Sequence, residues 1–197
     1  MPKKQATLFS QKPRSILAEL EFKGALELAG QVKLAVEEYC EKIEVAGSIR
    51  RQKPKVHDID FVVISKSDAE WKKINHKLRH LKAQPVCNGD SVITAYLPVK
   101  DGLFRVDFYR ARPETFGIHL LIRTGSADHN IYLAGYATQR GMRLKYSQGL
   151  IKEGQPIAGR TEQEVFKSLE LPYVEPIKRE IVDKKPAWMK NNQQKDR

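Results

Sequence analysis

Residues 47–65 of the chain read GSIRRQKPKVHDIDFVVIS. The apolar run at the end of this stretch predicts a buried strand over residues 59–65. Asp58 and Asp60 stand two positions apart where the strand begins, and side chains two apart lie on the same face of a strand. Two carboxylates so close repel each other, which raises their pKa values unless a cation lies between them. The pair therefore predicts a divalent-cation site, and its hard oxygen atoms favour Mg²⁺, with Mn²⁺ as an alternative.

The other end of the stretch predicts a site for phosphate. Gly47 and Ser48 would form a turn that offers backbone amides and a hydroxyl group, and Arg51 follows closely. Amides and guanidinium groups are donors suited to phosphate oxygens. An Asp-x-Asp pair by itself is more typical of a solvated turn or a helix cap. Here the pair borders an apolar strand and follows a glycine-serine turn, and the combination indicates nucleotide chemistry.

A third acid comes from a predicted hairpin. The runs SVITAYLPV and LFRVDFY are separated by Lys-Asp-Gly at 100–102, and Asp-Gly between alternating apolar runs is a good hairpin signal. In the second run, Arg105, Asp107 and Tyr109 share one face. A carboxylate inside such an apolar run is costly unless it is paired or bound to a metal. Asp107 is therefore either the partner of Arg105 or Arg110 in a salt bridge, or the third acid of the cation site.

The composition favours a nucleic-acid partner. The 197 residues include 35 Lys and Arg against 24 Asp and Glu, which gives a formal net charge of +11. Such a balance favours a polyanion or, less often, an anionic membrane. No apolar run approaches the ~20 residues of a membrane helix, and the first residues lack the apolar core of a secretory signal. We therefore expect a soluble, intracellular protein without a membrane partner, cytoplasmic or alternatively nucleoid-associated or viral.

The remaining pattern predicts an α+β fold. Apolar residues with helical spacing predict one long amphipathic helix over 24–43, which includes Cys40, and IEVAG at 43–47 then predicts a strand. Cys40 and Cys87 are both expected to be packing residues. Apolar periodicity, capping residues and turns predict helices at 67–81 (Ser67 as N-cap, with Glu70), 114–123, 127–140 (before Gly141) and from Thr161 (with Glu164), and a hairpin at 142–151.

Several of these stretches together resemble a known family. GSIRR followed by HDIDFVVIS resembles the Gly-Ser-x-Arg-Arg…Asp-Ile-Asp signature of the nucleotidyltransferase superfamily, and specifically of the family X DNA polymerases, which include DNA polymerase beta. The likeness continues in family order through FRVDFY, IRTGSADHNIYLAGYATQRGMRLKYSQGLI and TEQEVFKSLELPYVEP, and it extends over about residues 43–180. Four ordered segments are far more specific than Asp-x-Asp alone.

The resemblance implies a two-part architecture. A nucleotidyltransferase palm, with a mixed twisted sheet and helices on one side, would span residues 1–112, and a small α+β lobe that selects the nucleotide would span 113–180. We expect residues 181–197 to be a flexible basic tail. The chain looks like a minimal stand-alone member of the family, without the amino-terminal lyase and helix-hairpin-helix domains.

Matching positions imply roles for nine residues. Asp58 and Asp60 would hold two Mg²⁺ ions, and Asp107 would bind the catalytic ion near the primer 3′-OH. The positions that match the triphosphate motif are Gly47, Ser48 and Arg51, and those that match the segment beside the incoming sugar and base are Thr124, Gly125 and Asn130. The implied reaction is attack of a 3′-OH on a nucleoside triphosphate with release of pyrophosphate. It would be template-directed, in DNA repair or gap filling, by a monomer bound to primer-template or gapped DNA.

The sequence departs from the family pattern at several positions. Ile122 and Arg123 stand where Tyr-Phe is common, a change expected to alter the exclusion of ribonucleotides. Ala127 and Ala134 lack the polar groups with which some relatives contact the base and the template. Two other functions therefore stay open. One is a template-independent nucleotidyltransferase acting on RNA, DNA ends or another acceptor, and the other is a non-catalytic module that binds DNA ends.

Overall fold

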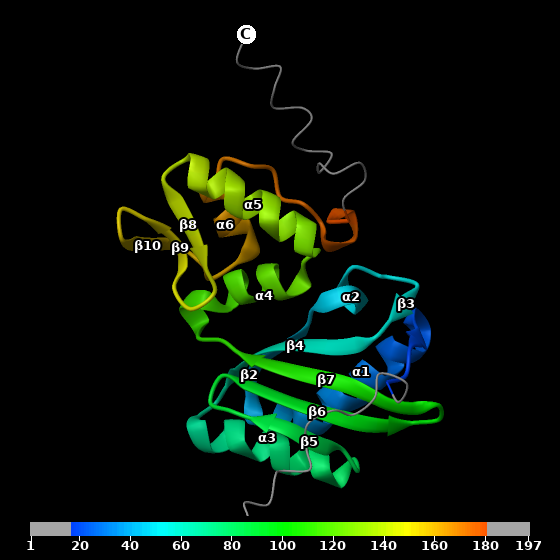
Figure 1. Cartoon of the computed structure of the whole chain (residues 1–197). Coiled ribbons are helices and arrows are strands. Elements are labelled where there is room, and N and C mark those ends of the chain that lie inside the picture. The colour runs from blue at the N-terminus through cyan, green and yellow to red at the C-terminus, as the bar shows by residue number, and fades with distance from the viewer. Residues whose placement is uncertain (1–16, 181–197) are drawn as a thin grey trace, which may run out of the picture.

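A computed structural model describes residues 17–180, which form two units one above the other (Figure 1). The first unit, which ends with the strand Gly102–Arg110, is built on a five-stranded sheet, and the second unit, which begins with the turn Pro113–Thr115, contains a three-stranded sheet. The first unit consists of β1 (Leu20–Glu21), α1 (Phe22–Val36), η2 (Glu37–Tyr39), β2 (Cys40–Val45), α2 (Gly47–Arg50), β3 (Lys55–Val56), β4 (Asp58–Ser65), α3 (Asp68–His80), β5 (Gln84–Asn88), β6 (Val92–Val99) and β7 (Gly102–Arg110). The second unit consists of η3 (Pro113–Thr115), α4 (Phe116–Thr124), α5 (Ala127–Gln139), β8 (Met142–Lys145), β9 (Gly149–Lys152), β10 (Gln155–Ala158), α6 (Glu162–Ser168) and η4 (Pro176–Lys178).

The five-stranded sheet carries the main core of the first unit on one of its faces. Its strand order is β2-β4-β7-β6-β5, with β4 and β7 parallel and the other neighbours antiparallel. Figure 1 shows α1 and α3 beneath this sheet. Alternate side chains point toward these helices, and among them Phe61 of β4 and Phe108 of β7 stack with 5.0 Å between ring centroids. The mixed sheet and its helices confirm the predicted α+β fold.

The second unit has its own hydrophobic core between α4, α5, α6 and the small sheet. Leu121 of α4, Leu133 of α5 and Phe166 of α6 are almost fully buried there. Thr161 caps α6, since its Oγ1 accepts a hydrogen bond from the Glu164 amide at 3.1 Å. The Glu164 carboxylate accepts one from the Thr161 amide at 3.3 Å, which confirms the predicted capping box.

Most other local predictions are confirmed, with small shifts at the ends of elements. The β6–β7 and β8–β9 hairpins and helices α3 and α5 lie where the sequence predicts them. Ser67 caps α3 by accepting a hydrogen bond from the Glu70 amide at 3.1 Å. The predicted strand begins one residue early, at Asp58, and the predicted Gly-Ser turn is a single helical turn, α2.

The long helix predicted over 24–43 is wrong at its C-terminal end. Helix α1 ends at Val36, a short 3₁₀ turn follows, and β2 begins at Cys40, which therefore lies in a strand. The reason is tertiary, because Ile43 of β2 pairs with Val63 of β4, and this ladder outweighs the helical periodicity. Strands β5 and β10 are missing from the prediction because their sequences, QPVCN and QPIA, contain proline and no regular apolar alternation.

Predictions about the two ends of the chain fall outside the described residues. These are the poorly ordered first dozen residues and the flexible basic tail at 181–197. Among residues 17–180, no helix combines the length and the apolar character that crossing a bilayer requires.

Candidate active site

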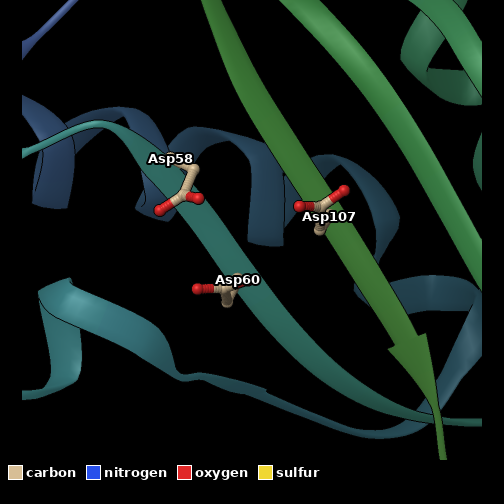
Figure 2. Close-up of side chains that lie close together, drawn as sticks. All are labelled: Asp58, Asp60 and Asp107. Atoms are coloured by element: carbon tan, nitrogen blue, oxygen red, sulfur yellow. The ribbon is translucent and has the colours of Figure 1, made fainter. Parts of the chain in front are cut away.

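The three predicted acids lie together on the sheet face opposite α1 and α3. Asp58 and Asp60 belong to β4 and Asp107 to the parallel strand β7, where Asp60 and Asp107 are register partners. Each carboxylate offers one oxygen atom, and these atoms all lie within 4.8 Å of one another. Figure 2 shows the three side chains on the two adjacent strands. Alternation along each strand and the register between the strands together build the cluster.

Burial and mutual repulsion make this cluster unfavourable when all three acids are charged. Asp107 is only 1% exposed, and Asp58 and Asp60 are partly buried. Burial, followed by the charges of Asp58 and Asp107, raises the pKa of Asp60 to about 7. Burial and the charge of Asp107 also raise the pKa of Asp58. Hard carboxylate oxygens at this spacing fit a divalent cation, whose charge would relieve the repulsion.

The raised pKa of Asp60 predicts how stability depends on pH without divalent cations. The ordinary pKa of aspartate is 3.8, and that of Asp60 in the folded protein is about 7. Between these two pH values Asp60 is protonated in the folded protein and charged in the unfolded chain, so the free energy of unfolding falls as the pH rises through this range. Asp60→Asn removes the charge, and we expect it to stabilise the protein in EDTA by about 2 kcal/mol at pH 8 and by little at pH 4. Urea unfolding at both pH values measures this difference. Equal effects at the two pH values would contradict it, and added Mg²⁺ should stabilise the wild type more than the variant.

Asp107 is held in place by two neighbours. Thr94, its register partner on β6, donates a hydrogen bond from Oγ1 to Oδ1 at 2.5 Å. Arg105, two residues earlier on β7, lies with Nε 2.8 Å from Oδ2 and donates from Nη2 to Oδ1 at 3.2 Å. Asp107 is therefore paired with Arg105 and also lies in the acid cluster. Arg110 pairs instead with Asp68, at 2.7 Å.

Gly47 brings α2 into direct contact with the acids. Its φ is 59°, and a Cβ atom at this position would lie 2.1 Å from Oδ2 of Asp60. The preceding residue, Ala46, donates its backbone N–H to the Asp60 carbonyl at 2.8 Å. Only glycine meets both the conformational and the steric requirement. In the same helical turn, the buried Oγ of Ser48 has no hydrogen-bond partner within residues 17–180.

The two arginines at the end of α2 both reach the second unit. Arg50 donates to Oγ1 of Thr124 at 2.7 Å and forms a two-pronged ion pair with Glu162, at 2.8 and 2.7 Å. Arg51 donates from Nε to Glu180 at 2.7 Å and from Nη1 to the carbonyl of Thr124. Sequence reasoning selected Arg51 and missed Arg50, because the partners of two adjacent arginines at a turn depend on the packing of distant segments.

The other predicted nucleotide-binding residues lie at the junction of α4 and α5, which faces α2. Thr124 ends α4, and Gly125 follows with a φ of 70°. A Cβ atom on Gly125 would lie 3.2 Å from Nη1 of Arg51, which shows how closely the junction approaches that arginine. Asn130, in the first turn of α5, donates from Nδ2 to the Ile122 carbonyl at 2.7 Å. Its amide group therefore ties α5 to α4 and steadies the junction.

A buried ion network that the sequence did not predict extends from α2 to the end of the second unit. Glu162 of α6 is 3% exposed and accepts hydrogen bonds from Arg179 at 2.7 Å and from the Tyr173 hydroxyl at 3.0 Å, in addition to those from Arg50. Burial alone would raise the pKa of Glu162, but Arg50 and Arg179 hold it below its ordinary value. The carboxylate is therefore charged at neutral pH and links the two units.

Arg123 adds a further charge beside the acids. Its guanidinium carbon lies 3.7 Å from the ring centre of Tyr109, which follows Asp107 on the same face of β7. The charge of Arg123 and a hydrogen bond from Tyr109 both oppose the rise in the pKa of Asp60. The departure from the family pattern noted in the sequence therefore lies at the site itself.

Comparison with known proteins gives matches to both units. The family model of the DNA polymerase beta thumb matches residues 119–180. A relative named DNA polymerase/3′-5′ exonuclease PolX, from Bacillus subtilis (strain 168), is 28% identical over 159 residues, which are 79% of this chain and 28% of that protein. A relative named Repair DNA polymerase X, from African swine fever virus, is 25% identical over 174 residues, which are 84% of this chain and 95% of that protein.

The chain thus spans little more than a quarter of the Bacillus relative and nearly all of the viral one. Alignments of 159 and 174 residues are too long for the second unit alone, so they extend into the unit that carries the three acids. The likeness is therefore not confined to the thumb, and both units of the chain resemble DNA polymerases of family X.

Proposed function

We propose that this chain is a template-directed DNA polymerase that adds nucleotides to a primer 3′-OH and releases pyrophosphate, in DNA repair or gap filling. The observation that carries the proposal is the cluster of Asp58, Asp60 and Asp107, whose oxygen atoms lie within 4.8 Å of one another beside α2. The names of both relatives describe DNA polymerases, and that of the viral relative describes repair. The net charge of +11 suits a DNA partner, bound by a monomer as primer-template or gapped DNA.

In this proposal the three carboxylates hold two Mg²⁺ ions, with Mn²⁺ as the alternative. Such ions, when bound, lower the pKa of the attacking hydroxyl and stabilise charge on the reacting phosphate. Asp58 and Asp60 would hold both ions, and Asp107 would hold the one nearer the primer end. Thr94 and Arg105 keep the Asp107 carboxylate oriented within the cluster. Their contribution is to fix the geometry before substrate arrives.

The triphosphate would lie along α2. Gly47 allows its backbone to approach closely, Ser48 offers a hydroxyl group with no partner among the described residues, and Arg51 offers a guanidinium group. These donors would bind the phosphates that do not react. We propose the first unit as the palm and the second as the lobe that selects the nucleotide, with the boundary at 112/113. The residues proposed beside the incoming sugar and base are Thr124, Gly125 and Asn130.

A second candidate, template-independent nucleotide addition, is favoured by one observation. Arg123 lies over Tyr109 at the position where family members commonly carry an aromatic residue before Thr-Gly. A charged guanidinium group in place of a flat apolar ring changes the surface against which the sugar would lie. Such a change favours a relaxed choice of nucleotide.

Primer extension separates the two candidates. The experiment uses one labelled primer on four templates that differ only in the first coding base, with single deoxynucleotides or ribonucleotides and Mg²⁺. We expect each template to favour its complementary deoxynucleotide by at least about tenfold. The same product pattern on all four templates would instead support template-independent addition. A protein that binds these DNAs but forms no product would support the end-binding module.

A further inference from the structure

A carboxylate from the end of the second unit is already bound to the arginine that we propose as a ligand of the triphosphate. Oε1 of Glu180 lies 2.7 Å from Nε of Arg51, and its Oε2 lies 3.4 Å from Nζ of Lys53. Burial alone would raise the pKa of Glu180, but the hydrogen bond from Arg51 and the charges of Arg51 and Lys53 hold it below its ordinary value. Two cations of the first unit therefore hold an anion supplied by the second unit.

This anion is held close to the acid cluster. Arg51 ends the helical turn that begins at Gly47, and Gly47 is the residue packed against Asp60. The space around Arg51 is therefore the place where a phosphate chain would extend from a reaction at the three acids.

Arg51 has no free edge for a phosphate while Glu180 and Thr124 are bound to it. A guanidinium group offers two edges for paired hydrogen bonds, Nε with Nη2 and Nη1 with Nη2. Nε already donates to Glu180, and Nη1 already donates to the Thr124 carbonyl. Carboxylate and phosphate oxygens accept the same kind of hydrogen bond from arginine. A two-pronged phosphate contact therefore needs one of these bonds to break.

We infer that Glu180 is an intramolecular stand-in for the phosphates of the nucleoside triphosphate, and that nucleotide binding displaces it from Arg51 and Lys53. The inference rests on the proposed function of this site. It adds Lys53 to the phosphate-binding residues and makes Glu180 a competitor of the substrate. Because Glu180 belongs to the second unit and Arg51 to the first, arrival of the nucleotide would exchange a contact between the units for a contact with substrate.

The test compares Glu180→Gln with the matched control Glu175→Gln, an exposed glutamate five residues earlier. Isothermal titration with inorganic tripolyphosphate measures binding of the phosphates alone, and thermal unfolding checks that each variant is folded. We expect Glu180→Gln to bind tripolyphosphate about fivefold more tightly than the wild type. The substitution removes the carboxylate that competes with phosphate for Arg51 and Lys53, and the size of the effect is that of a partly exposed ion pair. Glu175→Gln should bind like the wild type. Lys53→Gln, added to Glu180→Gln, should remove most of the gain.

Unchanged or weaker binding by Glu180→Gln would overturn the inference, and so would the absence of tripolyphosphate binding in every variant. Primer extension by the wild type reports on the proposed function separately. If the wild type extends primers and Glu180→Gln gains no affinity, the inference fails and the polymerase proposal stands. If the wild type extends no primer and Glu180→Gln still gains affinity, the polymerase proposal fails and the competition for the phosphate site stands.

Discussion

Asp107→Asn is expected to lower the rate of nucleotide transfer by about 10³-fold or more and to leave DNA affinity within about twofold of the wild type. Asp107 is 1% exposed, and its carboxylate completes the cluster with Asp58 and Asp60. Asparagine keeps one oxygen atom for the hydrogen bond from Thr94, so the strand register should survive, but it lacks the charge that a cation needs. Single-turnover primer extension measures the rate, and fluorescence anisotropy with labelled primer-template measures DNA binding.

Asp101→Asn is the matched control, because Asp101 lies exposed in the turn that joins β6 to β7, the strand of Asp107. It should extend primers like the wild type. If Asp107→Asn kept more than a tenth of the wild-type rate, the Asp107 carboxylate would not be a ligand of the catalytic ion. In that case the protein would still transfer nucleotides, and the cation site proposed at the three acids would be wrong.

The acid cluster could be predicted from the sequence in part, because the positions of its aspartates within their strands follow a local rule. Alternation alone places Asp58 and Asp60 on one face of a strand, and the same rule places Asp107 among the polar residues of the hairpin. Pairing Asp60 with Asp107 needs the register of two strands that are far apart in the chain, which no local pattern contains. The resemblance to family X supplied that step, and the structure confirms it.

Elements and contacts that depend on distant partners escaped prediction. The helical periodicity that begins in α1 continues through Cys40, and only pairing of β2 with β4 ends the helix at Val36. In the same way, GSIRR contains two arginines, and nothing local shows that Arg50 would meet Glu162 or that Arg51 would meet Glu180. Ion pairs between units depend on how the units pack. From the sequence alone, each arginine could pair with any of many acidic residues.

Glu162→Gln is expected to lower the free energy of unfolding by about 3 kcal/mol or more at pH 7. The Glu162 carboxylate lies between Arg50 and Arg179, and the Arg179 side chain is 0% exposed. The variant leaves both arginines charged, removes their counter-charge and turns an amide group with its own donors toward them. A buried charge without a partner is among the most destabilising changes in a protein interior. Urea unfolding of the wild type and the variant measures the difference.

The effect of Glu162→Gln should shrink in acid. Arg50 and Arg179, acting against burial, hold the pKa of Glu162 below its ordinary value of 4.5. Its contribution is therefore complete above pH 4.5 and is lost as the pH falls through the lower folded-state value, so the two proteins converge in stability there. Glu170→Gln, at an exposed position just after α6, should stay within about 0.5 kcal/mol of the wild type at every pH. If Glu162→Gln were as stable as that control at pH 7, the network would not be what holds α2 against the second unit, and the position of Arg51 beside the acids would need another cause.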